Sequence, residues 1–453
     1  MTADWRAPLL AGASLLDTRL QARNPAAWPG YEPRPALRVY RLRGGGPVAV
    51  VWDFGVHGGS FGEDDATALV AAAKSAITQR APLLTLVRSG GTRLQEGMAA
   101  LVGIPRARLA LLALAEAGLP HLSVADAPTT GGVWISVAAA ADLRVAVDGA
   151  TVGFSGPRVV QAVTGVLPGP GSHTAAAAYD AGLVDAILPG ADVPGWLAGA
   201  LRALTFAPSE VGQPVSVVPE QTTGEQQVQR TRARTRGGAD LLAELLTDRV
   251  PLRALRGDDT VAAMVGRLAG RPVVGVALAA RVGTRPTPDG YRLAARAFAL
   301  AGRLGLPVVS LVDTPGAEPG TAAEQDGLAP AVGAAMDALL LCRSPTVALV
   351  HGEGGSGGAL AAAVADVVLA TQEAYFAPIG PEGASAALRR PAQECADLMR
   401  VTPADLLALG AVDAVVPDAG AVAAYVVQQA GLPEQIRRSA RLARWSGTLP
   451  GQL

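Results

Sequence analysis

Short apolar runs that end in glycine turns recur along this 453-residue chain. Residues 81–87 form a leucine-rich run of strand length that ends at Ser89-Gly-Gly, and a later run ends at Thr129-Thr-Gly-Gly. Between them, over 97–116, apolar positions recur every three and four residues, which predicts a helix. Strands that alternate with helices and end in glycine turns indicate an α/β fold with mostly parallel strands.

The same pattern returns about 225 residues later. A second apolar run, 306–312, ends at Thr314-Pro-Gly, and a later one ends at Gly355-Ser-Gly-Gly-Ala. Each copy then carries an Ala-Asp pair, and 14 residues after that aspartate comes a Gly-Pro pair, at Gly156 and at Gly380. A repeat of this length predicts two similar domains.

The division between the two domains is expected in the middle of the chain. Residues 209–238 are rich in glutamine, threonine, arginine and valine and show little periodicity, which is typical of a linker. We therefore predict a first domain over 1–208 and a second over 239–453.

Composition narrows the class of protein. Half the residues are hydrophobic and 17% are charged, which is a globular composition, and the net charge of −1 argues against a nucleic-acid binder. The two distant cysteines form neither a disulfide framework nor a Cys₄ zinc site, so we expect a cytoplasmic protein without a metal. The N-terminus does not resemble a signal peptide, and charged residues interrupt the longest apolar stretches, so no membrane span is expected.

The glycine turns are the candidate functional sites. A glycine pair between a strand and a helix lets a ligand approach the backbone and leaves the first helical N–H groups free for a phosphate or an oxyanion. The alternative is tight packing of helix on strand, but matched positions in two copies favour a site. The turns lie at Gly90-Gly91, Gly131-Gly132, Gly316 and 354–358.

No nucleophile accompanies these turns. Ser89 and Ser356 lack the G-x-S-x-G elbow of serine hydrolases. His57 and His351 each abut a glycine turn and could contact a ligand, whereas His121 lies in an apolar strand and is expected to be structural. The pattern predicts a site that binds and polarises a substrate, suited to enolate chemistry rather than to a catalytic triad.

At these motifs both halves resemble a known family. Residues 37–189 resemble the β subunit of bacterial acetyl-CoA carboxylase carboxyltransferase, and residues 230–420 resemble its α subunit. The first half matches at Gly58-Gly-Ser-Phe-Gly, Ser89-Gly-Gly-Thr-Arg-Leu-Gln-Glu-Gly, Ala117-Gly-Leu-Pro-His-Leu-Ser-Val, Asp126-Ala-Pro-Thr-Thr-Gly-Gly-Val and Gly153-Phe-Ser-Gly-Pro-Arg-Val-Val. The second half matches at Gly257-Asp-Asp, Gly270-Arg-Pro-Val, Pro288-Asp-Gly-Tyr-Arg, Asp313-Thr-Pro-Gly-Ala-Glu-Pro-Gly, Gly352-Glu-Gly-Gly-Ser-Gly-Gly-Ala-Leu and Pro381-Glu-Gly.

The resemblance implies a fold and a reaction. The fold is that of the crotonase superfamily, two ββα spiral domains with the active site usually across a subunit interface. The reaction is transfer of a carboxyl group from carboxybiotin, held on a separate carrier protein, to the α-carbon of an acyl-CoA through an enolate. The implied partners are a biotin carboxyl carrier protein and a biotin carboxylase, and the implied assembly is a homo-oligomer, dimer or hexamer.

The resemblance also implies site residues. The oxyanion donors fall at Gly131, Gly132, Gly357, Gly358 and Ala359, with the choice of ligand for each turn left open. Gly58, Gly59, Ser60, Gly90, Gly91 and Gly316 would line the substrate site, and Arg93, Arg281 and Arg285 are candidate contacts for the CoA phosphates.

Lys74 is the only lysine in the chain. It lies in a helical-looking run and neither ends a glycine-rich phosphate loop nor has the Met-Lys-Met setting of a biotinylated lysine. If biotin takes part in the reaction, we expect it to arrive on another protein.

Some positions depart from the family pattern. His57 replaces a usual Met, Glu318 a usual Tyr, and Gly380 and Ala384 a usual Ser and Cys, so the acceptor need not be acetyl-CoA. Two alternatives therefore stay open. One is a biotin-independent decarboxylase of malonyl-CoA or a malonyl carrier protein, and the other is a non-catalytic scaffold that docks a carrier protein.

Overall fold

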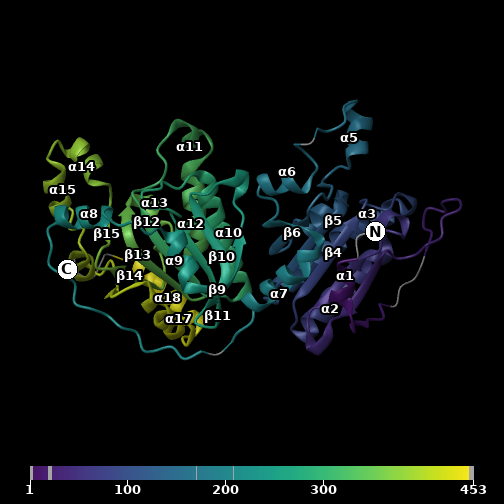
Figure 1. The fold of residues 1–453 in the computed structure, drawn as a ribbon, viewed down its shortest axis with the longest axis horizontal. Coiled ribbons are helices and arrows are strands. Elements are labelled where there is room, and N and C mark those ends of the chain that lie inside the picture. The colour runs from purple at the N-terminus through teal and green to yellow at the C-terminus, as the bar shows by residue number, and fades with distance from the viewer. Residues whose placement is uncertain (1–3, 19–22, 170, 208, 448–453) are drawn as a thin grey trace. The chain divides into compact units, whose positions relative to one another are not determined.

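The computed structural model describes residues 4–18, 23–169, 171–207 and 209–447. The chain divides into two compact units, Met1–Ala198 and Gly199–Leu453, each built on one eight-stranded sheet (Figure 1). The division falls inside a helix, α7. The segment predicted as a linker therefore belongs to the second unit in this division, and the domain limits given above stay predictions.

The first unit is an α/β layer structure. Its strands are β1 (Ser14–Leu15), β2 (Leu37–Arg41), β3 (Val48–Trp52), β4 (Leu83–Ser89), β5 (His121–Thr130), β6 (Leu143–Val147), β7 (Val152–Gly153) and β8 (Ala186–Leu188). Its helices are α1 (Arg6–Leu10), α2 (Glu63–Gln79), α3 (Met98–Glu116), α4 (Gly131–Val133), α5 (Pro157–Thr164), α6 (Ala175–Asp180) and α7 (Val193–Ala203). The sheet order is β1-β2-β3-β4-β5-β6-β8, with β7 paired to the end of β5.

The second unit follows the same plan with added helices. Its strands are β9 (Leu246–Leu252), β10 (Val261–Leu268), β11 (Arg271–Leu278), β12 (Val308–Thr314), β13 (Thr346–Gly355), β14 (Val367–Thr371), β15 (Tyr375–Ala377) and β16 (Ala414–Val416). Its helices are α8 (Gly224–Arg232), α9 (Gly238–Leu245), α10 (Pro288–Leu304), α11 (Thr321–Gln325), α12 (Leu328–Leu340), α13 (Ser356–Leu360), α14 (Pro381–Leu388), α15 (Ala392–Leu398), α16 (Pro403–Leu409), α17 (Val422–Ala430) and α18 (Glu434–Ser446). The sheet order is β9-β10-β11-β12-β13-β14-β16, with β15 paired to the end of β13.

The two sheets correspond strand by strand. In each, the first three strands are antiparallel and the rest are parallel. Ser89 pairs with Thr129 in the first sheet, and Thr314 pairs with Gly354 in the second. This register confirms the predicted α/β fold with two similar domains and sets the repeat at 225 residues in this region. Gly131 therefore corresponds to Ser356, one residue earlier than the sequence motifs suggested.

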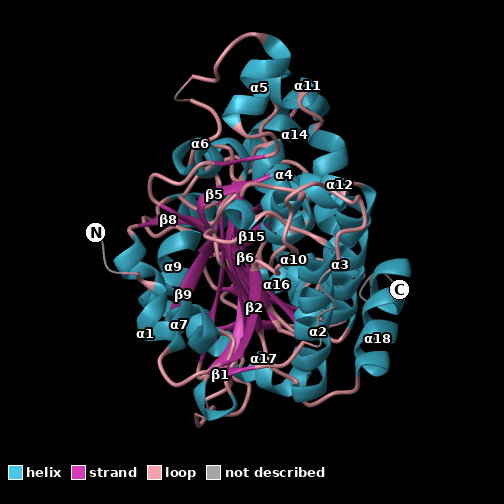
Figure 2. Ribbon diagram, turned by 90° about the vertical axis from the view of Figure 1, so that its right-hand side faces the viewer, coloured by secondary structure: helices cyan, strands magenta, loops and turns pink. Residues whose placement is uncertain are grey.

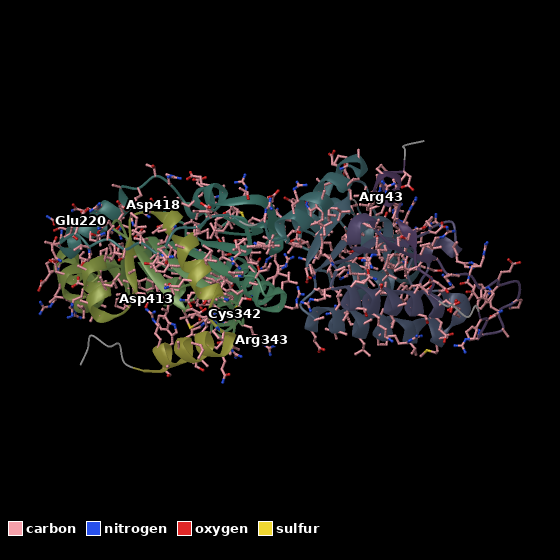
Figure 3. All side chains as sticks on the ribbon, turned by 90° about the horizontal axis from the view of Figure 1, so that it is seen from below. Arg43, Glu220, Cys342, Arg343, Asp413 and Asp418 are labelled. Atoms are coloured by element: carbon pink, nitrogen blue, oxygen red, sulfur yellow. The ribbon has the colours of Figure 1, made fainter. Side chains whose placement is uncertain are left out.

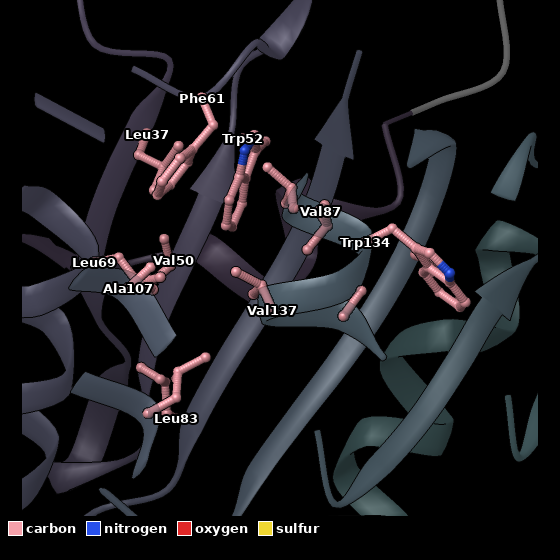
Figure 4. Packing of buried hydrophobic residues seen from close by; sticks show 14 of the residues in the cluster. Leu37, Val50, Trp52, Phe61, Leu69, Leu83, Val87, Ala107, Trp134 and Val137 are labelled. Carbon is pink, nitrogen blue, oxygen red and sulfur yellow. The ribbon is translucent and has the colours of Figure 1, made fainter. Parts of the chain in front are cut away.

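Buried apolar side chains hold each sheet to its helices. In the first unit, Figure 4 shows Leu37, Trp52 and Phe61 packed together, with the Trp52 and Phe61 rings stacked at 6.4 Å between centroids. The residues of β4 and β13 are almost all buried on both faces, so their sequences read as continuous apolar runs rather than as alternating patterns.

The second sheet carries helices on both faces. Strand alternation places Val347, Leu349 and His351 on one face of β13, and the first two belong to a core shared with α9 and α17. Helices α10 and α12 pack on each other, and α10 also packs on β10 and β11. Figure 2 shows strands in magenta with helices in cyan on either side of them.

Helix α3 has an unusual surface. Within the part of the chain that the structure describes, it is the one helix long and apolar enough to cross a membrane by length and composition. It packs against α2, but several of its apolar side chains are exposed: Met98, Leu101, Val102, Leu109 and Leu112. The expectation of no membrane span stays a prediction.

Candidate active site

In the first unit the candidate site begins where two neighbouring parallel strands end. The turn after β4 contains Gly91, and the turn after β5 begins at Gly131; their φ angles are +111° and +69°. A Cβ atom on Gly131 would lie 2.8 Å from the Cα atom of Gly91. Only glycines allow these two backbones to come so close.

A serine hydroxyl holds the first of these turns. The Gly91 N–H donates to Ser89 Oγ at 3.1 Å, and the Gly90 N–H donates to the Gly58 carbonyl at 3.0 Å. A Cβ atom on Gly59 would lie 2.0 Å from the Arg88 carbonyl oxygen. The structure therefore brings these predicted glycines together. They serve packing, because each one already makes a hydrogen bond or a close backbone contact within the protein.

The N–H groups that are left without a partner define the donor pair. The Gly131 N–H donates to the Phe154 carbonyl at 2.7 Å, whereas the Gly132 N–H, at the start of α4, has no partner among the described residues. Thr92 forms a parallel bridge with Phe61, which leaves its own N–H directed away from Phe61. Since the Thr92 nitrogen lies 3.6 Å from the Cβ position built on Gly131, it faces the same turn.

The second unit repeats this arrangement. The Gly316 N–H donates to Thr314 Oγ1 at 3.2 Å, and the φ angle of Gly316 is +129°. A Cβ atom on Gly355, at the end of β13, would lie 2.2 Å from the carbonyl carbon of Pro315. Here too a hydroxyl holds the turn and a glycine permits close backbone contact.

The donors of the second unit lie at the start of α13. Gly357 faces open space, and a Cβ atom on Gly358 would lie 2.7 Å from the Ala317 nitrogen. The N–H groups of Gly357, Gly358 and Ala317 have no partner among the described residues. Ala359 follows Gly358 in the first turn of α13, and its role as a donor stays a prediction.

Two candidate donor positions, Thr92 and Ala317, were not predicted from the sequence. Each follows a glycine turn at the same place in its copy, but neither residue type signals a role. What places them is the direction of a backbone N–H, which depends on strand pairing. The aligned motifs Gly-Gly-Thr and Pro-Gly-Ala could have marked them as equivalent.

The three predicted arginines have different surroundings. Arg93 is 1% exposed and ion-paired with Asp65 at 2.6 Å and Glu96 at 3.1 Å. This position does not support a contact between Arg93 and CoA phosphates, because its guanidinium is enclosed by carboxylates. It also donates to Ser60, and so fixes the Gly58–Ser60 loop.

The other two arginines are more accessible. Arg285 Nη1 lies 3.5 Å from the Cβ position built on Gly316, so Arg285 is brought to the second turn. Arg281 is exposed and makes a two-bond ion pair with Asp259, at 2.8 and 3.2 Å. The geometry brings Arg285 to the site, and the role of Arg281 stays a prediction.

The histidines have distinct environments. His57 Nε2 lies 2.9 Å from the Glu32 carbonyl, and its ring contacts Tyr31. Buried His121 is hydrogen-bonded to Thr85 inside the sheet, as expected of a structural residue. Burial is the main cause that lowers the pKa of His351 to about 4, so its ring is neutral near pH 7.

The described residues contain no group of three or more metal-ligating side chains that could hold an ion. The expectation of no metal stays a prediction. The chemistry that the two sites offer is carried by backbone N–H donors at two equivalent turns, which suits oxygen atoms that gain negative charge.

Comparison with known proteins agrees with both halves of this description. Residues 213–441 match the family described as acetyl co-enzyme A carboxylase carboxyltransferase-like. Over 400 residues the chain is 40% identical to the acetyl-coenzyme A carboxylase carboxyl transferase subunits beta/alpha of Salinispora tropica, covering 82% of this chain and 71% of that protein. It is 34% identical to the probable biotin-dependent acyl-coenzyme A carboxylase beta3 subunit of Mycobacterium bovis, covering 89% and 87%.

Solved structures show the same fold. The hexameric transcarboxylase 12S core, with methylmalonyl-coenzyme A and methylmalonic acid bound, superposes with a TM-score of 0.76 at 23% identity, over 98% of this chain and 89% of that one. A single-chain, multi-domain long-chain acyl-CoA carboxylase superposes with a TM-score of 0.70 at 17% identity, over 92% of this chain and 45% of that one. The two similar sheets are therefore two crotonase-like domains.

Proposed function

This chain belongs to the acetyl-CoA carboxylase carboxyltransferases with fused beta and alpha halves, and we propose that it carries a carboxyl group from biotin on a separate carrier protein to the α-carbon of an acyl-CoA. One observation carries this proposal. At two equivalent turns, a backbone N–H after β4 or β12 and a backbone N–H at a helix start face one space without a partner among the described residues. These pairs are Thr92 with Gly132, and Ala317 with Gly357 or Gly358.

Paired N–H groups suit this reaction because it builds negative charge on oxygen. When the α-carbon of a thioester loses a proton, the charge moves to the carbonyl oxygen, and two fixed donors stabilise it. Biotin, when bound, supplies the carboxyl group and has a carbonyl oxygen of its own that needs donors. One turn would hold the thioester oxygen and the other the biotin oxygen.

The biotin is proposed to come from a partner. Lys74 is exposed on α2, a regular helix, and its neighbours Ala73 and Ser75 differ from the Met-Lys-Met setting of a biotinylated lysine. The proposed partners are accordingly a biotin carboxyl carrier protein and a biotin carboxylase. The proposed location is the cytoplasm.

The proposed assembly is a homo-oligomer. Exposed apolar side chains are concentrated on α3 and on two turns that contact it, which carry Leu94 (77% exposed) and Ile135 (53% exposed). A large exposed apolar surface usually marks a protein interface. The transcarboxylase 12S relative is a hexamer, which supports the same reading.

A transfer assay tests the function. The purified chain is given a carrier protein whose biotin bears a ¹⁴C-labelled carboxyl group, together with acetyl-CoA, propionyl-CoA or a longer acyl-CoA. We expect label in an acid-stable acyl-CoA product, and no product when avidin is added first. Release of CO₂ from malonyl thioesters without biotin would identify the decarboxylase instead, and no turnover in either format would identify a scaffold.

Two variants of Gly132 test whether its backbone N–H is a donor. Gly132→Pro removes the N–H, whereas Gly132→Ala keeps it and places its Cβ atom against side chains alone, 2.7 Å from Ile104 Cδ1 and 3.3 Å from Thr92 Oγ1. Loss of one such donor costs about 10²–10³-fold in kcat. We expect a loss of that order for Gly132→Pro, a much smaller one for Gly132→Ala, and unchanged circular dichroism for both. Full activity of the proline variant contradicts the oxyanion assignment.

A further inference from the structure

In the first unit, a tryptophan side chain fills a place beside β5. Trp5 Nε1 donates to Asp126 Oδ2 at 3.3 Å, and Arg6 Nη2 donates to the same oxygen at 2.6 Å. The Trp5 ring also lies against Gly190, where a Cβ atom would come within 2.8 Å of Trp5 Cδ1. The indole is thus held between the strand and the loop that follows β8.

The equivalent place in the second unit is open. Strand register equates Asp126 with His351, and Leu188 with Val416, so the loop after β16 replaces the loop after β8. Between these elements lies a cavity of about 710 Å³, a volume typical of small-molecule sites. Its walls come from residues 233–236, from α9, from β13 and β14, and from the loop that carries Asp418, a residue labelled in Figure 3.

One polar group in this cavity has no partner. His351, which is 4% exposed, lines the cavity, and its Nε2 atom is bonded to nothing among the described residues. Arg234 Nη1 lies 3.4 Å from His351 Nδ1 and can only donate, so Nδ1 is the acceptor of a neutral ring and Nε2 carries the proton. The cavity therefore contains an N–H donor that needs an acceptor.

The remaining walls indicate the kind of ligand. Leu241, Leu245 and Ala419 give an apolar surface. The charged residues on the walls are two arginines and three acids, Arg234, Arg236, Glu244, Glu373 and Asp418, and Arg234 is already paired with Asp313 at 2.6 Å. Because the acids outnumber the arginines, the charge of the walls does not favour a phosphate ligand.

We propose that this cavity binds a small, uncharged, planar aromatic molecule with a hydrogen-bond acceptor at its edge, in the place that the Trp5 indole fills in the first unit. The acceptor pairs with His351 Nε2–H. Because His351 lies four residues before Gly355 on β13, a bound ligand acts on the strand that leads to the second donor turn. The site is therefore suited to an effector rather than to the substrates.

Binding of two indoles tests the proposal without any assay of turnover. Indole-3-carboxamide has a carbonyl acceptor and indole does not, and each is titrated into the full chain by calorimetry. We expect saturable 1:1 binding of the carboxamide, about tenfold tighter than indole, which is the effect of one hydrogen bond of about 1.4 kcal/mol. Because no substrate is present, the outcome is independent of the proposed carboxyl transfer.

Three variants identify the place. Ala419→Trp fills the cavity and should abolish binding. His351→Leu should remove the tenfold preference, and His351→Gln, which keeps an N–H donor, should retain most of it. No saturable binding to the wild-type chain, or binding that Ala419→Trp leaves unchanged, overturns the proposal. So does dissociation of the oligomer by Ala419→Trp without any binding of either probe, since the cavity would then be an interface between copies.

Discussion

The two units hold the same backbone turn with different side chains. In both, a hydroxyl at the end of a strand receives a glycine N–H two residues later, and the strand register is the same. Around that turn they differ. The first unit has buried Arg93 between two carboxylates, whereas the equivalent residue of the second unit, Glu318, accepts the nearby Gly320 N–H at 3.2 Å. Strand register and turn chemistry thus fix the donors, and the surrounding side chains are free to diverge.

The largest expected effect concerns that divergence. Arg93→Met leaves Asp65 and Glu96 buried without their cation, which costs about 3–5 kcal/mol. Glu318→Met, at the equivalent place, should cost less than about 1 kcal/mol, because Glu318 is only half-buried and pairs with a single backbone N–H. Urea unfolding of both variants measures the contrast.

A rescue separates charge from shape in the first unit. The double variant Arg93→Met with Asp65→Asn removes one of the stranded charges and should recover part of the lost stability. If Arg93→Met and Glu318→Met lower the unfolding free energy equally, the side chains at these two equivalent positions stabilise their units equally. That result would contradict the difference described above.

The second expected effect concerns Gly355, whose counterpart in the first unit is Thr130. Gly355→Thr copies the first unit's residue, but its Cβ atom would meet the Pro315 carbonyl carbon at 2.2 Å. Backbone cannot yield as a side-chain tip can, so we expect a loss of about 3 kcal/mol in unfolding free energy and of most activity. Gly357→Ala is the matched control, because nothing lies within 4 Å of its Cβ position. Thermal unfolding that is the same for both variants would contradict the close contact.

These positions show what could be predicted from the sequence. The glycines of the four turns, the alternation of strands and helices, and the internal repeat all follow from local residue types and were predicted. The one-residue difference in alignment, Gly131 with Ser356, could not be predicted, because Ser356 adopts a positive φ of +65° that residue type does not announce. Strand pairing reveals it.

The directions of side chains and of backbone N–H groups could not be predicted from the sequence either. Arg93 could be read as a surface cation, although the Arg-x-x-Glu spacing to Glu96 was a signal that it pairs within its own turn. Thr92 and Ala317 gave no signal, because any residue has an N–H. Only the pairing of neighbouring strands determines which N–H faces the site.

The third expected effect is a dependence of stability on pH that arises in the second unit. Burial lowers the pKa of His351 to about 4, beside Asp313 and Arg234, against about 6.5 in the unfolded chain. The unfolded state therefore binds the extra proton first as pH falls. Stability from this residue is complete above pH 6.5 and is lost progressively between pH 6.5 and pH 4. We expect about 2 kcal/mol less unfolding free energy at pH 5.0 than at pH 7.5.

The matched variant is His351→Gln, which cannot titrate. Urea unfolding at the two pH values measures this decrease in unfolding free energy. The decrease should be about 2 kcal/mol smaller in the variant than in the wild-type chain. An identical pH dependence in both would assign the effect to other groups.

The smallest expected effect distinguishes the two hydroxyls that hold the turns. Each accepts a glycine N–H, at 3.1 Å for Ser89 and 3.2 Å for Thr314. Thr314 Oγ1 also has close acceptors for its own proton, the Gly316 carbonyl at 2.9 Å and the Thr284 carbonyl at 3.1 Å, whereas Ser89 Oγ reaches the Gly91 carbonyl only at 3.5 Å. A typical hydrogen bond contributes about 1 kcal/mol, so Thr314→Val should cost about 2 kcal/mol and Ser89→Ala about 1 kcal/mol. Urea unfolding of the two variants measures this difference. A larger loss of unfolding free energy for Ser89→Ala than for Thr314→Val would mean that the first turn, with its buried ion pairs, depends on its hydroxyl more than the second does.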